Sequence, residues 1–474
     1  MTEYQPVSKP IQYRLKPAER RLILFIGDVL ISIIALVIAV IFWAQEDFLE
    51  ISWVFIQERI PAWFYLLPLF WILVNVESYD IRRASRRADT LRGIAIAAAL
   101  SFGFYLLIYF TSEPNSLPRR GVAAFITASS ILMLIWRFSY ISIFTAPQFM
   151  RRVLVVGAGR AGSTLAKIVH DLWPPPFFLV GFVDDDPNKW ETTIEGHKVL
   201  GGSKDLPQLI NQYQISDLVF AISGQMNDDM FKAMLGAAEA GVEIMTMPMV
   251  YEETLGRVPI FLHQSDWILR SFMDEAQAGG FYEIIKRLVD ILGGLVGTTL
   301  LLLVLPLVAV AIYLDSGSPV IYSQLRVSKN GRLYKIYKLR TMRQDSEKDG
   351  KPQVTVENDE RITRVGKFLR KSHMDELPQF INVLRGEMSL VGPRAERMEL
   401  VNDLTDKIPF YRARLLVKPG ITGWAQVNFG YAATVEDTAI KLEYDLYYIK
   451  HRGLLLDFII LLRTFGTVIG FRGQ

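Results

Sequence analysis

The chain has 474 residues, of which 51% are hydrophobic, and its formal net charge is +3. This apolar content exceeds that of an average soluble protein and indicates a membrane protein, while the net charge is too small to indicate nucleic acid as a partner. The absence of cysteine excludes disulfides and thiolate catalysis, and five scattered histidines without a His-Glu-x-x-His pattern argue against a zinc site.

Residues 1–150 are predicted to form a bundle of four transmembrane helices. The apolar runs are roughly 22–43, 62–77, 91–111 and 121–145. A helix needs ~20 apolar residues to cross a bilayer core and ~17 at the low end, so the second run is marginal. Lysine and arginine gather before the first run, between the second and third, and after the fourth, which places both ends of the bundle in the cytoplasm. Asp28 lies in the first run, and we expect it near the interface because Arg20 and Arg21 precede it closely.

Residues 151–248 are predicted to form a Rossmann-like α/β domain. An apolar strand leads into Gly157-Ala158-Gly159-Arg160-Ala161-Gly162 and a helix, and Asp184 ends a second strand about 20 residues on. This arrangement is the dinucleotide-binding fingerprint. Two interpretations stay open. Gly157, Gly159 and Gly162 bind a nucleotide with Asp184 on a ribose, or the glycines only permit the tight turn and close helix packing.

Residues 249–281 are predicted to form a connector that ends in a Gly279-Gly280 hinge. The apolar run within 282–314 is long enough to cross a bilayer and contains Pro306. Basic residues stand on both sides of the run, so both flanks are predicted to be cytoplasmic. A re-entrant helix that enters one leaflet, breaks at Pro306 and returns satisfies both observations.

Residues 315–474 carry short motifs suited to phosphate chemistry. Asp375 and Glu376 stand where an amphipathic helix is predicted to begin, with Asp375 as its N-cap. An ionised carboxylate there can meet a phosphate as a nucleophile or through a metal ion. Residues 453–470 are predicted to form an interfacial helix lying on the membrane. The remaining motif residues are Lys338, Arg340, Gly392, Pro393, Arg394, Lys418, Pro419 and Gly420.

Together these motifs resemble those of the bacterial polyprenyl-phosphate hexose-1-phosphate transferases, most specifically from about Lys286 to the C-terminus. Four membrane helices followed by a nucleotide-fold domain resemble the large form of this family. The resemblance implies a monotopic catalytic domain at the bacterial inner membrane, with the Rossmann-like domain in the cytoplasm in a regulatory or dimer-stabilising role. Two positions depart from the family pattern, which typically has serine at Leu305 and proline at Ala395.

The resemblance also implies a reaction. A UDP-hexose donates hexose 1-phosphate to undecaprenyl phosphate with release of UMP, which starts an exopolysaccharide or capsule repeat unit; glucose is the favoured hexose. We expect Asp375 to form a phosphosugar-aspartyl intermediate that the polyprenyl phosphate then attacks. Glu376 is expected to hold Mg²⁺, which needs few carboxylates besides phosphate oxygens and water. The expected substrate contacts are Arg394, Lys418, Lys338 and Arg340, with Gly392, Pro393, Pro419 and Gly420 shaping their loops.

Two other functions stay open from the sequence. A membrane-tethered, NAD-dependent nucleotide-sugar dehydratase or epimerase also combines four membrane helices with a Gly-x-Gly-x-x-Gly domain, and it needs Tyr-x-x-x-Lys on one helix. That pattern occurs at Tyr282/Lys286, next to the membrane segment, and at Tyr334/Lys338, in a predicted strand. A non-catalytic scaffold for polysaccharide assembly would not need the two adjacent carboxylates.

Overall fold

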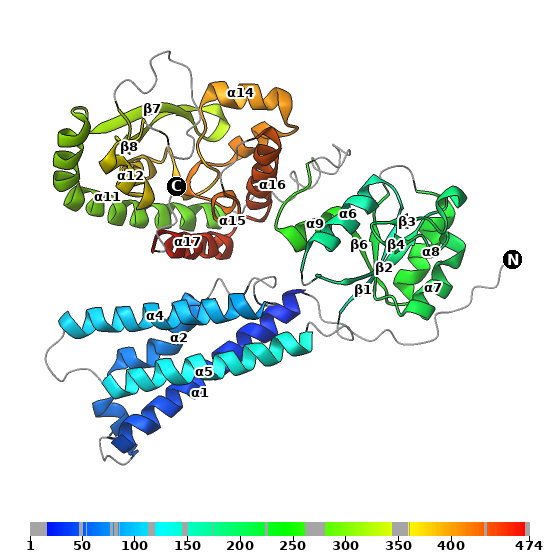
Figure 1. The fold of residues 1–474 in the computed structure, drawn as a ribbon, viewed down its shortest axis with the longest axis horizontal. Coiled ribbons are helices and arrows are strands. Elements are labelled where there is room, and N and C mark those ends of the chain that lie inside the picture. Colours follow the sequence, from blue (N-terminus) through cyan, green and yellow to red (C-terminus); the bar gives the residue numbers. More distant parts are fainter. Residues whose placement is uncertain are drawn as a thin grey trace. The chain divides into compact units, whose positions relative to one another are not determined.

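The structure is a computed structural model that describes residues 17–46, 51–53, 55–75, 79, 84, 86–111, 119–144, 150–173, 175–222, 226–260, 280–343, 359, 361–430 and 434–469. The chain folds into two compact units, Met1–Val250 and Tyr251–Gln474. Figure 1 shows a helical bundle, an α/β domain and a mixed α/β domain along the chain. The sheets and helices that carry chemistry are described below, unit by unit.

Unit 1 begins with helices whose length and composition suit a membrane. Glu19–Gln45, Arg87–Leu106 and Arg119–Phe144 are each long and apolar enough to cross one. The second predicted run forms the shorter apolar stretch Ala62–Val74, and Gly280–Ser316 in unit 2 is the fourth candidate span in the described part of the chain. The protein is therefore a membrane protein. The elements are α1 (Pro17–Glu46), η1 (Phe55–Arg59), η2 (Ala62–Leu66), α2 (Leu67–Val74), α4 (Arg87–Thr111) and α5 (Arg119–Phe144).

The bundle contains an ion pair that the sequence pattern did not reveal. Asp28 in α1 is fully buried and accepts a hydrogen bond from Arg137 in α5, whose side chain is also buried. Buried charges in membrane helices are tolerated when they are paired, so this contact fixes α1 and α5 in one register. The position of Asp28 near the interface stays a prediction; its ion-pair partner lies 109 residues further along the chain.

The second part of unit 1 is a Rossmann-like domain around a parallel sheet of order β2-β1-β5-β6. The central strand β1 is an unbroken apolar run because helices cover parallel sheets on both faces, and Val153–Val156 are buried. The strands are β1 (Arg152–Val156), β2 (Phe178–Val183), β3 (Thr193–Ile194), β4 (His197–Lys198), β5 (Asp217–Phe220) and β6 (Glu243–Thr246). The helices are α6 (Arg160–Asp171), η5 (Pro187–Lys189), η6 (Ser203–Asp205), α7 (Leu206–Tyr213), α8 (Asp228–Glu239) and α9 (Met247–Leu255). The residues of α9 from Tyr251 on belong to unit 2.

Unit 2 combines a long helix, an antiparallel hairpin and a short parallel strand pair. The hairpin pairs β7 with β8 around a turn in which Asn330 has a φ of 59°, and β9 runs parallel to β10. The strands are β7 (Ile321–Val327), β8 (Leu333–Leu339), β9 (Ser389–Val391) and β10 (Gly420–Thr422). The helices are α11 (Gly280–Ser316), η7 (Lys329–Gly331), α12 (Arg364–Lys371), η8 (Met374–Glu376), α13 (Gln379–Arg385), α14 (Met398–Lys407), η9 (Tyr411–Leu416), α15 (Trp424–Asn428), α16 (Val435–His451) and α17 (Leu454–Ile469).

The first ten residues of unit 2 come from the predicted connector, and they pack as part of its core. Val258 and Ile260 are 1% and 3% exposed and lie in the same hydrophobic cluster as Leu446 of α16. Tyr251 Oη donates a hydrogen bond of 2.8 Å to Glu443 of α16. Residues Tyr251–Ile260 therefore form a strap on unit 2 rather than a free linker. The rest of the predicted connector, up to residue 279, lies outside the described residues.

The long helix α11 combines an exposed apolar surface with a close helix contact. Leu303, Leu307 and Leu314 are each more than 70% exposed, as expected for side chains that face lipid. At Gly297 an added Cβ would lie 2.3 Å from the Phe380 ring, so glycine is needed for the close approach of α13. Pro306 lies inside the helix, and the α11 ribbon changes direction along its length in Figure 1.

Candidate active site

The two adjacent carboxylates lie in a short 3₁₀ turn between α12 and α13. The turn η8 begins after His373, which has a φ of 57°, and only then does α13 start, at Gln379. The expectation that Asp375 caps this helix is wrong, because the N-cap residue of α13 is Pro378 and no side chain caps it. The chain makes one 3₁₀ turn first, closed by the hydrogen bond from Leu377 N to Met374 O.

Glu376 is held by two cations from distant parts of unit 2. Its Oε1 atom accepts from Lys338 Nζ at 2.8 Å and from Arg394 Nη2 at 3.0 Å. Lys338 comes from β8, and Arg394 comes from the loop after β9. Three of the predicted site residues thus converge on one oxygen atom. The Arg394 side chain remains 43% exposed, so a ligand can still reach its guanidinium group.

The two carboxylates titrate in opposite directions. Burial alone would raise the pKa of Glu376, but Lys338 and Arg394 outweigh it and hold that pKa well below the usual range. Burial and the neighbouring Glu376 charge both raise the pKa of Asp375, which is 9% exposed, against the opposing effect of Lys338, Arg370 and Arg394. The site therefore contains one firmly ionised carboxylate and one more basic carboxylate, a combination typical of catalytic sites.

Two further predicted cations lie apart from this pair. Lys418 Nζ and Arg287 Nη2 both approach Gly386 at the end of α13, within 3.6 Å of where a Cβ would stand. Burial and the Arg287 charge lower the pKa of Lys418. Arg340 Nη1 is buried and has no hydrogen-bond partner within the described ranges. Arg394 and Lys338, but not Lys418, thus provide the cations bonded to Glu376.

The two predicted loops pack backbone against backbone, which accounts for their glycines. An added Cβ at Gly392 would lie 2.3 Å from Lys418 O, and one at Gly420 would lie 2.1 Å from Gly392 N. Gly420 N also donates a hydrogen bond of 2.9 Å to Pro393 O. No side chain fits between these loops, so glycine at both positions lets the loop that carries Arg394 rest on β10.

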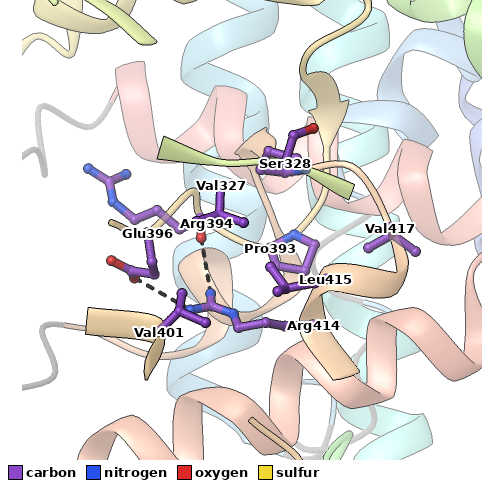
Figure 2. A pocket seen from close by; sticks show the side chains of 10 residues that line it. Val327, Ser328, Pro393, Arg394, Glu396, Val401, Arg414, Leu415 and Val417 are labelled. Carbon is purple, nitrogen blue, oxygen red and sulfur yellow. Dashed lines mark hydrogen bonds and ion pairs between the residues drawn. The ribbon is translucent and has the colours of Figure 1, made fainter. Parts of the chain in front are cut away.

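A small pocket lies around Arg394 (Figure 2), and neither Asp375 nor Glu376 is among its lining residues. It includes Pro393 and Arg394 from one loop and Pro419 from the other, with Glu396 and Arg414 on its polar side. Sequence reasoning missed Glu396, Arg414 and also Arg370, whose Nε donates a hydrogen bond of 3.0 Å to Thr341 Oγ1. Their local patterns do not separate them from the surrounding exposed charges, so only their buried partners identify them.

Both Tyr-x-x-x-Lys pairs are engaged in contacts within unit 2. Tyr282 and Lys286 do share helix α11, but both bind the Asp457 carboxylate of α17, at 3.0 and 2.8 Å. Tyr334 and Lys338 lie in strand β8, as the sequence predicts, and Lys338 binds Glu376. Neither pair therefore presents a tyrosine and a lysine together on a free helix face.

The nucleotide fingerprint in the Rossmann-like domain is explained in part by packing. Gly157 has a φ of 112°, and an added Cβ at Gly162 would lie 2.2 Å from Gly157 O. The Asp184 carboxylate accepts hydrogen bonds from Ala158 N at 2.8 Å and from Lys189 Nζ at 2.9 Å, so it already has partners. An added Cβ at Gly159 would meet no atom within 4 Å, so packing does not explain this glycine. Nucleotide binding here stays a prediction.

The residues at the carboxylate pair are compatible with Mg²⁺. No group of three or more histidine, aspartate or glutamate side chains with metal-site geometry occurs among the residues that the structure describes. Mg²⁺ does not require such a group, because it is held by one or two carboxylates together with phosphate oxygens and water. Glu376 meets its two cations through Oε1, which leaves Oε2 for a metal ion.

Two families match this chain. Residues 281–471 match the family described as bacterial sugar transferase, and residues 75–248 match the one described as CoA-binding domain. The first match covers the carboxylate pair and both loops, and the second covers the parallel sheet.

Individual relatives are similar over 39% to 67% of the chain. A UDP-N-acetylgalactosamine-undecaprenyl-phosphate N-acetylgalactosaminephosphotransferase from Aeromonas hydrophila is 39% identical over 62% of this chain and 67% of its own length. An undecaprenyl-phosphate glucose phosphotransferase from Komagataeibacter xylinus is 30% identical over 67% of this chain and 59% of its own length. The exopolysaccharide production protein PSS from Rhizobium leguminosarum bv. phaseoli is 39% identical over 39% of this chain and 94% of its own length. The chain thus spans about three fifths to two thirds of the first two relatives.

The opposite pKa shifts predict opposite effects of neutralising the two acids. The raised pKa of Asp375 means that its charge costs stability once the pH exceeds the pKa of the unfolded chain, so Asp375→Asn should raise the Tm by about 2–5 °C at neutral pH, and by less as the pH falls toward about 4. The lowered pKa of Glu376 contributes stability that is present above about pH 4 and lost as the pH falls further, so Glu376→Gln should lower the Tm at pH 7.

Thermal unfolding of the full chain in detergent would measure both shifts. Asp406→Asn, at an exposed acid of α14, is the matched control and should leave the Tm unchanged. Equal Tm changes for the two site variants would contradict the opposite electrostatics of the pair.

Proposed function

The chain belongs to the bacterial sugar transferases of the polyprenyl-phosphate hexose-1-phosphate transferase family, and on this basis we propose that it transfers a sugar 1-phosphate from a UDP-sugar to undecaprenyl phosphate. UMP is the second product, and the reaction starts a polysaccharide repeat unit. The observation that carries the proposal is the pair of adjacent carboxylates, of which Asp375 is buried and Glu376 is held between Lys338 and Arg394. Both substrates are phosphate anions, so cations beside the nucleophile are what their approach requires.

The proposed reaction proceeds in two displacements at one phosphorus atom. An oxygen of Asp375 attacks the phosphorus bound to the sugar, the bond to the UMP oxygen breaks, and UMP leaves. A phosphate oxygen of undecaprenyl phosphate then attacks the same phosphorus and releases the Asp375 carboxylate. The raised pKa of Asp375 supports this role, because a more basic carboxylate is a better nucleophile in its ionised form.

In this proposal Arg394 and Lys338 also bind the donor phosphate. In the structure they neutralise Glu376, and Arg394 keeps an exposed guanidinium that suits a phosphate. When a donor arrives, its phosphate charge shares these cations with Glu376, which becomes more available to a metal ion. Lys418 and Arg340 remain proposed phosphate contacts; Arg340 Nη1 has no hydrogen-bond partner among the described residues, which supports its part in this proposal.

The identity of the sugar is proposed only as a class. The names of the two longer relatives specify N-acetylgalactosamine and glucose, and the 39% and 30% identities do not favour one sugar decisively. We therefore propose a UDP-hexose or UDP-N-acetylhexosamine, to be resolved with a panel of UDP-glucose, UDP-galactose and UDP-N-acetylgalactosamine.

Release of UMP tests the transfer directly. The full chain, with undecaprenyl phosphate and the correct UDP-sugar, should release UMP, and radiolabelled sugar phosphate should remain on the protein when the acceptor is left out. Asp375→Asn should lower the release by at least about 1,000-fold without lowering the Tm. Asp406→Asn should behave like the unchanged protein. Turnover by Asp375→Asn at the unchanged rate would remove the nucleophile assignment.

Mg²⁺ is the proposed metal ion, with Glu376 as its protein ligand and the donor phosphates as further ligands. Bound there, it would neutralise phosphate charge. Glu376→Gln should raise the Mg²⁺ concentration for half-maximal UMP release by about 10-fold or more. It should also remove the rise in Tm that Mg²⁺ and UDP-sugar together give the unchanged protein. An unaltered Mg²⁺ dependence in both measurements would exclude Glu376 as a ligand; Glu399→Gln, at an exposed acid of α14, is the control.

The position of the catalytic unit at the membrane is also a proposal. Both flanks of α11 are basic, and its apolar side chains are exposed, which supports a re-entrant helix that keeps the carboxylates on the cytoplasmic side of the inner membrane. Because the chain has no cysteine, single cysteines report topology without background. A cysteine at Arg332 should react with an impermeant maleimide only after the cells are opened, whereas one at Ser52 should react in intact cells. Labelling of Arg332→Cys from outside would show that α11 crosses the membrane.

A further inference from the structure

The loop that carries Arg394 is held at four consecutive carbonyl oxygens, two of them by arginine side chains. Backbone amides hold the outer two carbonyls, and guanidinium groups hold the inner two, those of Arg394 and Ala395. The donors are Gly420 N to Pro393 O at 2.9 Å, Arg414 Nη2 to Arg394 O at 3.0 Å, Arg326 Nη1 to Ala395 O at 3.2 Å and Val327 N to Glu396 O at 3.0 Å. This backbone has little freedom to move.

The Arg414 side chain is itself held by Asp445 and Tyr411. It is 5% exposed, and its Nη2 atom donates to Asp445 Oδ2 at 2.9 Å, while Nη1 donates to Tyr411 Oη at 2.7 Å. Asp445 is 2% exposed and lies in α16, so the arginine is anchored to a long buried helix. Figure 2 shows Arg414 below the loop, joined to the backbone oxygen of Arg394, with the Arg394 side chain pointing away from it.

Glu396 adds a second attachment on the same side of the loop. Its carboxylate lies 3.5 Å from Lys441, 3.6 Å from Arg414 and 3.7 Å from Arg326. Burial would raise the pKa of Glu396, but these three cations outweigh it and lower that pKa, so the carboxylate is ionised at neutral pH. The residue between the two attachments is Ala395, which places no ring constraint on the backbone. Side-chain contacts therefore add to the backbone hydrogen bonds in holding the loop.

We propose that Arg414 is a positioning residue for the transfer reaction. By holding the carbonyl group of Arg394 it fixes the origin and direction of that side chain, so the Arg394 guanidinium reaches Glu376 and the donor phosphate. Arg414 touches neither of them. Arg394 has a long and partly exposed side chain, so the position of its guanidinium group depends on where its backbone is held. The inference rests on the proposed function, because it gives Arg414 a role in that reaction.

A double-mutant cycle in the full chain, reconstituted in nanodiscs, tests this role. Arg414→Met should lower kcat for UMP release by about 10- to 100-fold, and Arg394→Met by a similar factor. If Arg414 acts through Arg394, adding Arg414→Met to Arg394→Met should lower kcat by no more than about twofold further. If the double variant instead lost kcat by the product of the two single-variant factors, the proposal would be overturned. Arg412→Met, an exposed arginine of the same short helix η9, should leave kcat unchanged.

A second variant controls for the possibility that Arg414→Met lowers kcat only by destabilising the fold. Arg414→Met leaves Asp445 buried without its cation, whereas Arg414→Met with Asp445→Leu removes both charges and is expected to fold. This pair should show the same loss of kcat with a Tm close to that of the unchanged protein. Recovery of normal kcat in the pair would show that Arg414 only balances the charge of Asp445, and the proposal would fail.

Hydrogen–deuterium exchange measures how firmly the loop is held, independently of the transfer reaction. Peptides covering residues 391–397 should exchange at least about 10-fold faster in both Arg414 variants, and at the normal rate in Arg412→Met. Unchanged exchange in the Arg414 variants would refute the clamp even if their turnover were low. If the unchanged protein released no UMP from any UDP-sugar, the proposed function and the catalytic role would fall, while the exchange would still decide whether Arg414 holds the loop.

Discussion

A carboxylate taken out of water needs cations, and the contact between Glu376, Lys338 and Arg394 supplies them. An ion buried without a partner costs several kcal/mol, on the order of the whole stability of a domain, so the fold has to bring these three groups together. Strand β8 contributes one cation, the loop after β9 contributes the other, and the turn η8 presents the acid. Much of unit 2 is arranged so that these three segments meet.

The same contact separates the chemistry of two neighbouring acids. With both cations on Glu376, the charge of Asp375 is less well compensated, and Asp375 becomes the more basic of the two. A catalytic site needs this difference, because a nucleophile and a metal ligand have different requirements. Adjacent residues in a 3₁₀ turn point in different directions, so each acid can face its own partner.

The sequence predicted what local patterns encode. The length of the apolar runs predicted the long helices of the bundle, and unbroken apolar runs predicted the parallel strands. The motifs predicted Glu376 and the two cations that bond to it, Lys338 and Arg394. It failed where partners are distant in the chain. Arg414 meets Asp445 31 residues on, and no periodicity distinguishes it from the exposed Arg412 two residues earlier. The N-cap expectation for Asp375 failed for another reason, because an extra turn of 3₁₀ helix precedes α13.

The strap Tyr251–Ile260 has a consequence for shorter forms of this protein. The family match begins at residue 281, but Val258 and Ile260 already belong to the hydrophobic core around α16. A fragment cut at the family boundary would uncover that core and take away the strap residues that α16 binds, Tyr251 at Glu443 and Glu252 at Lys450 and His451. A relative matched over 94% of its length by only 193 residues has little room for such a segment.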